Sequence, residues 1–257
     1  MIKFFRHIRY NLMETGKTSR YLKYAIGEII LVVIGILIAL QINNWNENRK
    51  TEVTSQKLFN ELYNEYIVAG KHFKNSFEAN SLYISFLEDI LMNWSQLNIE
   101  TVNEFQQKYF KVNLSTTFYL SSYSQFNDPE IVIFQKAVND GTINLVNNEF
   151  AKSISRRYNG INRLNEMITQ EYQIGQEINL HIAKSYSKIL VGFKENRTVN
   201  IDAKTLDTLF KAFRSDGTLK FLIRSRLDLA KIRGFILKGD YEEIENDLTK
   251  FKSLLDD

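Results

Sequence analysis

The longest apolar run of the chain lies between Ala25 and Ile42, where 18 residues include only two polar side chains, Glu28 and Gln41. A helix rises about 1.5 Å per residue, so this run spans roughly 27 Å, close to the roughly 30 Å hydrocarbon thickness of a bilayer. A core helix of a water-soluble protein carries a polar face along its length, and this run has none. The pattern therefore predicts a membrane-spanning helix that occupies, with its flanks, residues 19–46.

Beyond the span, apolar residues recur at steps of three and four, the spacing of one helix face. The first such row predicts a helix over about residues 47–95, and its only polar members are Ser76 and Asn80. Either these two fix the register of the packed helices, or they mark a wet point where Phe77 and Ile84 take over the packing. The row consists of Phe59, Leu62, Tyr66, Ala69, Phe73, Ser76, Asn80, Tyr83, Leu87, Ile90 and Trp94.

A second row of similar length covers about residues 148–191. Because its length matches that of the first row, we expect the two helices to pair antiparallel as the spine of a bundle. The row consists of Phe150, Ile154, Ile161, Ile168, Tyr172, Ile182, Tyr186 and Ile189.

Shorter helices are expected between and after these rows. Asp128 and Pro129 predict a helix start, since an acidic cap followed by proline suits the first turn, and that helix should stop at Asn139–Gly141. Gly239 and Asp240 are expected to separate the last two helices. The further expected helices are 101–110, 203–213, 218–238 and 241–255, with a loop at 113–127 and a polar connection at 192–202. Helix 203–213 is expected to bury Leu206, Leu209, Phe210 and Phe213.

These patterns predict an all-α protein. Its architecture is expected to be an N-terminal transmembrane helix followed by an elongated antiparallel helical bundle, with two long helices and several short ones. Residues 47–257 form the expected extracytoplasmic helical domain. A single proline in 257 residues also favours helices over a β-sandwich, which needs many turns.

Positive charge is concentrated at the N-terminus. The whole chain has a formal net charge of +3, whereas residues 1–24 carry six cations against Glu14 and therefore +5. Residues 1–18 are expected to form a basic amphipathic arm at the cytoplasmic membrane surface, with a frayed basic terminus as the alternative. The rest of the chain is slightly acidic, which argues against nucleic acid as a partner. The six cations are Lys3, Arg6, Arg9, Lys17, Arg20 and Lys23.

This charge distribution also predicts the orientation of the span. Six cations precede it, against three shortly after it, Arg49, Lys50 and Lys57. Cytoplasmic flanks are enriched in Lys and Arg, so the N-terminus is expected in the cytoplasm. The bundle is then periplasmic, and the protein is a single-pass protein of the cell inner membrane.

The flanks of the span support an uncleaved signal anchor. Its apolar core exceeds the roughly 7–15 residues of a signal-peptide core, and no small-x-small cleavage site follows it. Tyr21 and Tyr24 on one side and Trp45 on the other match the aromatic belts of membrane interfaces.

One stripe of the span contains Glu28, Val32, Gly35 and Ala39 when residues are placed 100° apart. Gly35 and Ala39 form a small-xxx-small pair, which lets another helix approach closely. We therefore expect a membrane-protein partner or a homo-oligomer through this helix, within the lipid bilayer.

Glu28 itself has two interpretations. An acid within a span can serve an ion path or bind a partner's basic residue. Alternatively, it is a shallow carboxylate that reaches water near Lys23 or Arg20. With one span and no second acid in it, the shallow position is favoured.

Residues capable of chemistry are sparse. The chain has no cysteine and three histidines, His7, His72 and His181, without a convincing ligand spacing around them. Phosphate-loop, dinucleotide and zinc-protease motifs are missing from the sequence. We therefore expect no metal, no cofactor and no enzymatic activity.

A basic stretch over residues 218–238 is the remaining candidate binding feature. An anionic ligand or lipid headgroup is conceivable, but acids in the following helix can neutralise the cations, so a solvated, mutually paired surface is favoured. The cations are Lys220, Arg224, Arg226, Lys231, Arg233 and Lys238, and the acids are Glu242, Glu243, Glu245 and Asp247.

The N-terminal block resembles a known family. The stretch MIKFFRHIR at residues 1–9 and YAIGEIILVVIGILIALQINNWNE at residues 24–47 resemble an uncharacterised family of single-pass membrane proteins that is abundant in Bacteroidota. The body resembles that family more loosely, between Phe134 and Tyr158. The resemblance implies an anchored helical extracytoplasmic domain of unknown function, and it implies no catalytic residues.

The leading hypothesis is thus a membrane-anchored, non-enzymatic interaction or scaffold protein. The alternative is an extracytoplasmic ligand-sensing helical module that acts through a membrane partner. A polar-lined pocket between the long helices would favour sensing, and a dry seam would favour the scaffold. An enzyme would need acids, tyrosines and histidines that only folding brings together.

Overall fold

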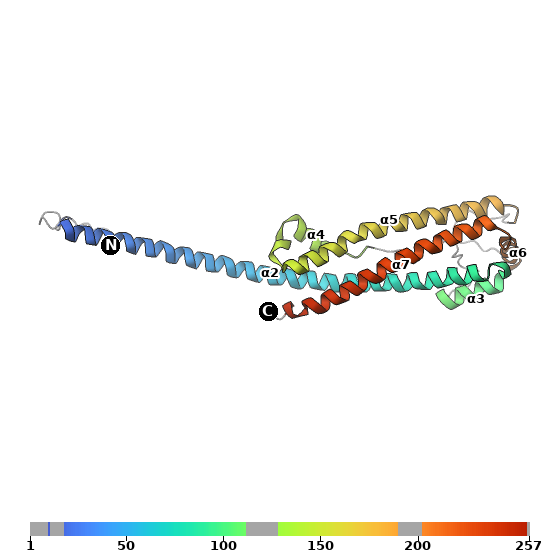
Figure 1. The fold of residues 1–257 in the computed structure, drawn as a ribbon, viewed down its shortest axis with the longest axis horizontal. Helices are drawn as coiled ribbons and strands as arrows, with labels where there is room; N and C mark the ends of the chain where they lie inside the picture. The colour runs from blue at the N-terminus through green and yellow to red at the C-terminus, as the bar shows by residue number, and fades with distance from the viewer. Residues whose placement is uncertain (1–9, 11–17, 112–127, 190–201, 256–257) are drawn as a thin grey trace. The chain divides into compact units, whose positions relative to one another are not determined.

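The computed structural model describes Tyr10 and residues 18–111, 128–189 and 202–255, which form helices joined by short turns (Figure 1). No strand occurs in these ranges, so the predicted all-α class is confirmed. Most of the basic arm, the predicted loop at 113–127 and most of the predicted connection at 192–202 lie outside the described residues. The chain divides into two compact units, Met1–Lys57 and Leu58–Asp257.

The first unit contains the predicted span. Its described residues belong to α2 (Thr18–Met92), which also supplies the first helix of the second unit. Among the described residues, α2 is the one helix long and apolar enough to cross a membrane. Its apolar side chains between Ile26 and Ile42 are exposed, with Leu31 at 73%.

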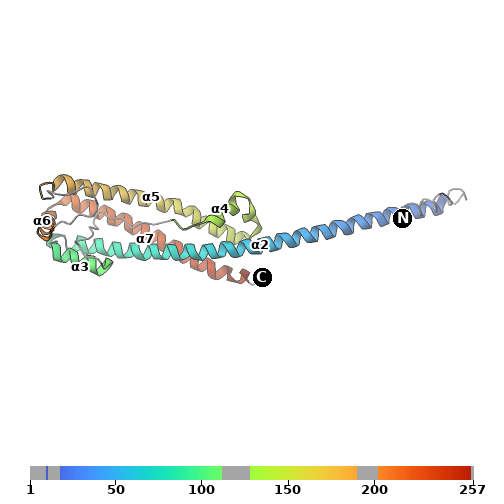
Figure 2. The same ribbon diagram turned by 180° about the vertical axis from the view of Figure 1, so that it is seen from behind.

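The second unit is built on three long helices: α2 from Leu58 onward, α5 (Asn148–Ser185) and α7 (Gly217–Phe251). Ring contacts join Phe59 to Phe150 at 4.9 Å and Tyr66 to Tyr158 at 6.0 Å, so α2 and α5 run in the same direction. α7 runs opposite to both, as Figures 1 and 2 show.

The expected antiparallel pairing of the two long rows is therefore wrong. Two short helices, α3 (Ile99–Phe110) and α4 (Val132–Asn139), lie between α2 and α5 in the sequence, and they lead the chain back along the bundle. α3 packs beside Phe86, whereas α4 packs beside Glu65, nearer the start of the second unit. The chain has thus returned before α5 begins, which makes α5 parallel to α2.

The predicted helix start at Asp128 is also wrong, because α4 begins four residues later. The carboxylate of Glu65, on α2, accepts hydrogen bonds from the backbone N–H groups of Ile133 (2.7 Å) and Phe134 (3.1 Å). These N–H groups have no partner inside the helix and need an acceptor. Asp128 instead accepts from Asn165 of α5 at 3.0 Å. The predicted stop is confirmed: α4 ends at Asn139, before Gly141 with φ 78°.

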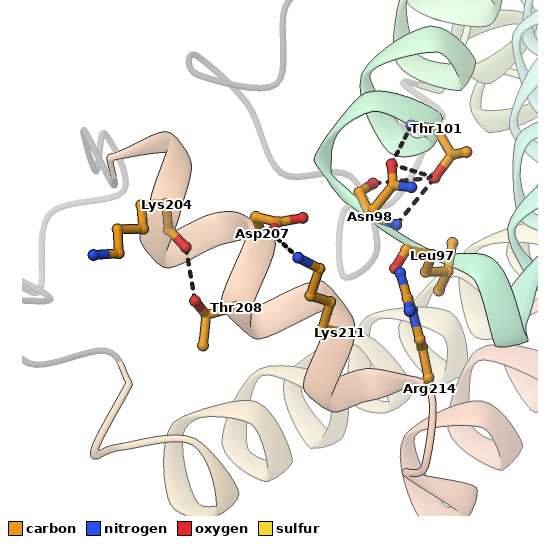
Figure 3. Close-up of polar contacts among 8 residues, drawn as sticks. All are labelled: Leu97, Asn98, Thr101, Lys204, Asp207, Thr208, Lys211 and Arg214. Carbon is orange, nitrogen blue, oxygen red and sulfur yellow. Dashed lines mark hydrogen bonds and ion pairs between the residues drawn. The ribbon is translucent and has the colours of Figure 1, made fainter.

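The short helix α6 (Ala203–Phe213) matches its predicted range, and α3 begins two residues before its predicted start. α3 begins with a reciprocal cap, in which Asn98 and Thr101 each accept from the other's backbone N–H (Figure 3). Arg214, just after α6, donates to the carbonyl of Leu97 at 2.7 Å and ties the two helices together. The buried face of α6 consists of Leu206, Leu209, Phe210 and Phe213, as predicted.

The predicted break at Gly239 and Asp240 does not occur, and α7 is one continuous helix of 35 residues. The carboxylate of Asp240 pairs with Arg157 of α5 at 2.9 Å, so tertiary contact holds it in the helix. Glycine in a helix interior costs only about 1 kcal/mol, which packing readily offsets.

The first predicted row is confirmed, and all its members except Ser76 are buried. In the second row, the predicted burial of Tyr172 is wrong: this side chain is 41% exposed, whereas its neighbour Glu171 is fully buried. α5 also ends at Ser185, six residues before its predicted end. The buried apolar residues form two clusters, one around α6 and one around α4. The remaining described elements are η1 (Trp94–Gln96), η2 (Thr142–Leu145) and η3 (Lys252–Leu255).

Candidate functional site

Buried polar side chains from all three long helices of the second unit contact one another. We call this set the polar layer. Each residue of the polar layer is 3% exposed or less. They are Asn80 and Tyr83 of α2, Glu171 of α5, and Arg226 and Arg233 of α7.

Arg233 joins the three helices. Its Nη1 lies 3.1 Å from Glu171 Oε1, and its Nε donates to Asn80 Oδ1 at 3.1 Å, with Nη2 donating to the same oxygen. The Asn80 amide in turn donates to the backbone carbonyl of Ala230 at 2.8 Å. Asn80 is therefore bound to α7 through both ends of its amide, which favours the register interpretation over the wet point.

Arg226 contacts the backbone of Glu171. Its Nη1 donates to the backbone carbonyl of Glu171 at 3.1 Å, and its guanidinium carbon lies 5.3 Å from the centroid of the Tyr83 ring. A guanidinium within about 6 Å of an aromatic face is attracted by the ring.

Close approach of α2 and α7 makes this packing possible. A Cβ atom at Gly234 would lie 2.8 Å from Asn80 Nδ2 and 3.3 Å from Ile84 Cδ1. No real Cβ atom is tolerated at the first distance without a shift of its neighbour. Glycine at 234 is thus what lets the Asn80 amide reach the backbone of α7.

The charges of the polar layer do not balance. Two guanidinium groups face one carboxylate, and arginine stays protonated in proteins. Burial raises the pKa of Glu171, an effect that Arg233 and then Arg226 oppose. Burial also lowers the pKa of Arg233 and raises that of Tyr83 to about 12. A buried ion pair adds little net stability, because the cost of desolvation offsets the attraction between the charges.

The sequence prediction missed the polar layer. Arg226 and Arg233 were expected in a solvated surface, yet they are 0% and 1% exposed. The signal was present in the heptad spacing: both lie in one row with Leu219 and Asp240, next to the buried row of Ile223, Ala230, Leu237, Ile244 and Phe251. Leu222, Leu229 and Ile236, which also recur at heptad spacing, are only partly buried.

A second polar cluster lies where α5 ends and α7 begins. Asp216 Oδ2 accepts from Tyr186 at 2.5 Å and lies 2.7 Å from His181 Nε2. Its Oδ1 accepts from the backbone of Leu219 at 2.8 Å and so caps α7. Despite burial, these hydrogen bonds hold the pKa of Asp216 below its usual range. The described residues contain no group of three His, Cys, Asp or Glu placed to bind a metal.

We expect the replacement Asp216→Ala to lower the free energy of unfolding at pH 7 by about 1–2 kcal/mol, the usual cost of a lost helix cap. A depressed carboxylate pKa stabilises the fold above the ordinary value of 3.8, and this contribution disappears as pH falls through the folded value. The charge-dependent share of this difference should therefore decrease as pH falls below 3.8. Unfolding curves recorded from pH 7 down into the acid range measure it, with Asp228→Ala, exposed on α7, as the control. A difference that does not decrease as the pH falls would contradict the assignment.

The predicted stripe of the span lies on α2 in the first unit. Val32, Gly35 and Ala39 are exposed, and Glu28 is partly exposed. A Cβ atom at Gly35 would meet no atom within 4 Å. Within the described residues, nothing packs against this glycine, so the stripe is available to another helix.

The structure describes only some of the aromatic and basic residues that were predicted at the two membrane–water interfaces. Trp45 is 64% exposed and Lys23 is exposed. Tyr21, Tyr24 and Arg20 lie in the first turns of α2, with side chains outside the described part of the structure. The remaining predicted cations, Lys3, Arg6, Arg9 and Lys17, lie outside the described residues altogether.

Comparison with known proteins gives one family. A family of unknown function, DUF6090, matches residues 28–162. The matched range begins at Glu28, includes Asn80 and Tyr83, and ends before Glu171. Neither the curated proteins nor the solved structures give a match.

Proposed function

Because the chain belongs to DUF6090, a family of unknown function, we propose a role from its own features: a membrane-anchored, non-enzymatic interaction or scaffold protein. Exposure of the apolar run on α2 is the observation that carries the proposal. Ile29, Leu31 and Ile42 are each more than 60% exposed. Monomeric soluble proteins rarely expose so large a continuous apolar surface, and a lipid bilayer is the medium that would cover it.

The proposed topology is a single-pass protein of the inner membrane with a cytoplasmic N-terminus and a periplasmic bundle. Its support is the excess of cations before the span and the aromatic residues on either side. Reporter fusion after Asp257 tests it. A reporter that works only outside the cytoplasm should be active, and activity of a cytoplasmic reporter alone would reverse the proposed orientation.

Ligand sensing through a membrane partner is the second candidate. The buried charges of the polar layer support it, because they lie between the three long helices, where a ligand that binds a sensing module could change how the helices pack. The scaffold is preferred, since Asn80 is engaged by α7 at both ends and Gly234 leaves no room for a methyl group.

The small-residue stripe gives the interaction role a specific test. We expect Gly35→Ile to reduce recovery of a stoichiometric membrane partner, or of a second tagged copy, by about tenfold or more in affinity purification from native membranes. A bulky side chain at a small-xxx-small pair prevents close helix approach. Since a Cβ atom at Gly35 meets nothing within 4 Å, the bundle should be unaffected.

Gly27→Ile is the matched control. A Cβ atom at Gly27 would also meet nothing within 4 Å, and this glycine lies about 80° around the helix from Gly35. Equal loss with both variants would point to insertion rather than to the stripe. Recovery of the natural chain as a lone monomer would count against the interaction role itself.

A further inference from the structure

The outer face of α7 exposes a strip of large apolar side chains. Phe221, Ile232 and Phe235 are 68%, 52% and 81% exposed. At 100° per residue they lie within about 60° of one another, on the side of α7 opposite to its buried row. Several large apolar side chains exposed on one helix face make this strip a candidate contact surface.

The two flanks of this strip differ in chemistry. Leu222, Leu229 and Ile236 lie on one flank and are partly buried, so the apolar surface continues on this side. On the opposite flank, Lys231 is bound to Glu88 of α2 at 2.6 Å, and this flank therefore faces toward α2. It is basic, and its exposed cations are Lys220, Arg224, Lys231 and Lys238.

Acids balance only part of the basic flank. Lys238 lies 3.7 Å from Glu242, and Glu245 lies further along the same flank. Among the described residues, Lys220 and Arg224 form no ion pair. The flank is therefore positive at its N-terminal end.

Two acids that were expected to neutralise these cations are bound elsewhere. Glu243 pairs with Arg157 of α5, and Asp247 accepts a hydrogen bond from Tyr66 of α2 at 3.0 Å. The mutually paired surface predicted from the sequence therefore covers only the C-terminal part of the basic flank.

Asp228 interrupts the apolar strip. It is exposed, it lies seven residues from both Phe221 and Phe235, and at 100° per residue it falls between them. A carboxylate that is covered by an apolar surface costs free energy unless a cation or a hydrogen-bond donor meets it. The hydrocarbon of a lipid layer offers neither, so an occupant of this strip needs a group that binds Asp228.

A second copy of the chain does not supply that group on this face. In the proposed topology, two copies in one membrane run in the same direction, and a two-fold axis sets each residue level with its counterpart. Asp228 would then meet Asp228 of the other copy, and the basic flank of each copy would meet the apolar flank of the other. Like charges brought together at an interface repel, so the charges of this face point to a different protein.

We propose that the outer face of α7 binds an amphipathic helical segment of another protein. Apolar side chains of the segment, at steps of three and four, cover the strip from Phe221 to Phe235, which is about 21 Å long. Acids along one side of the segment meet Lys220 and Arg224, and a cation of the segment meets Asp228. Such complementary charges give specificity and fix register.

This docking surface rests on the proposed interaction role and gives that role one partner of stated chemistry. The direction of the partner helix is not constrained by the membrane anchor of this chain. The segment therefore belongs either to another membrane protein or to a protein on the same side of the membrane as the bundle.

Photocross-linking of the full chain in native membranes tests the surface. With p-benzoylphenylalanine in place of Phe235, the chain should cross-link to a segment whose apolar residues recur at steps of three and four and whose acids lie on one side. Leu180, 53% exposed on α5, is the matched control position and should give no such product. Products with lipid or with a second copy, a segment without this pattern, or equal yield at both positions would overturn the proposal.

Charge reversal tests the chemistry. Lys220→Glu with Arg224→Glu should lower the yield of that cross-link by about tenfold or more, because like charges are then placed together. Lys71→Glu with Lys74→Glu makes the same charge change at exposed positions of α2 and should leave the yield unchanged. Lysines in place of the partner's acids should restore the lost cross-link. Equal loss in both double variants, or failure to restore it, would overturn the charge pairing.

Affinity purification separates failure of this inference from failure of the interaction role. A chain that retains a stoichiometric partner but gives no cross-link from position 235 would overturn the docking surface and leave the interaction role standing. Recovery of a lone monomer would overturn both.

Discussion

Replacement of Glu171 with leucine is expected to lower the free energy of unfolding by about 3–5 kcal/mol, the cost of breaking a buried ion pair from one side. Arg233 Nη1 lies 3.1 Å from Glu171 Oε1, and both residues are at most 1% exposed. Loss of the carboxylate removes the charge that Arg233 binds and that Arg226 lies beside. Thermal unfolding of the full chain in detergent measures the effect.

Two further variants separate charge from packing. Glu166→Leu, on the same helix and away from the polar layer, should change stability by no more than about 0.5 kcal/mol. Adding Arg226→Met and Arg233→Met to Glu171→Leu should recover much of the loss, because replacing a whole buried charge set with apolar side chains is often neutral or stabilising. If the triple variant is less stable than Glu171→Leu, the ion pair is not what the leucine disrupts.

Replacement of Gly234 with valine is expected to lower the free energy of unfolding by about 3 kcal/mol, at the upper end for overpacked cores. The new Cβ would lie 2.8 Å from Asn80 Nδ2. That amide cannot easily move away, because it donates to Ala230 and its oxygen accepts from Arg233. Thermal unfolding again measures the effect, and the hydrogen bonds of Asn80 to Ala230 and Arg233 are the contacts that we expect to be lost.

Gly239→Val supplies the matched control on the same helix. A Cβ at Gly239 meets nothing within 4 Å, so the substitution should change stability by no more than about 0.5 kcal/mol. Equal destabilisation at both glycines would mean that a β-branched side chain is costly anywhere on this helix, and that the contact with Asn80 does not decide the outcome.

Helix positions were largely predictable because the signals are local. Steps of three and four from Phe59 to Trp94 correctly identify a buried face, and the apolar side of residues 203–213 is correct at all four positions. The stop near Gly141 was also predictable, since its φ of 78° favours glycine. These features depend on residues within a few positions of one another.

Features that depend on distant residues were missed. α4 begins at Val132 because Glu65, far earlier in the chain, accepts its first N–H groups. α7 continues through Asp240 because Arg157 binds that carboxylate. The parallel direction of α2 and α5 depends on where the intervening helices pack, and row lengths carry no information about direction.

Residues of the candidate sites divide in the same way. Residue type and helical spacing within the span were enough to identify Glu28, Gly35 and Ala39, and the helix that would pack against them stays a prediction. The polar layer required three helices to be assembled, because an arginine on a basic helix gives no sign that it pairs with Glu171. Only the heptad spacing of Arg226 and Arg233 offered a hint.

The order in which the bundle can close follows from the place of α7 late in the chain. Asn80 binds Ala230, 150 residues later, and Tyr63 donates to the carbonyl of Leu248, 185 residues later. Such distant pairings fold slowly, because loop-closure entropy must be overcome first. α5 covers part of the buried face of α2, but the part that contacts α7 stays exposed until α7 has been synthesised. A chain shortened before α7 would keep that apolar surface exposed, which makes truncated or stalled chains prone to aggregation.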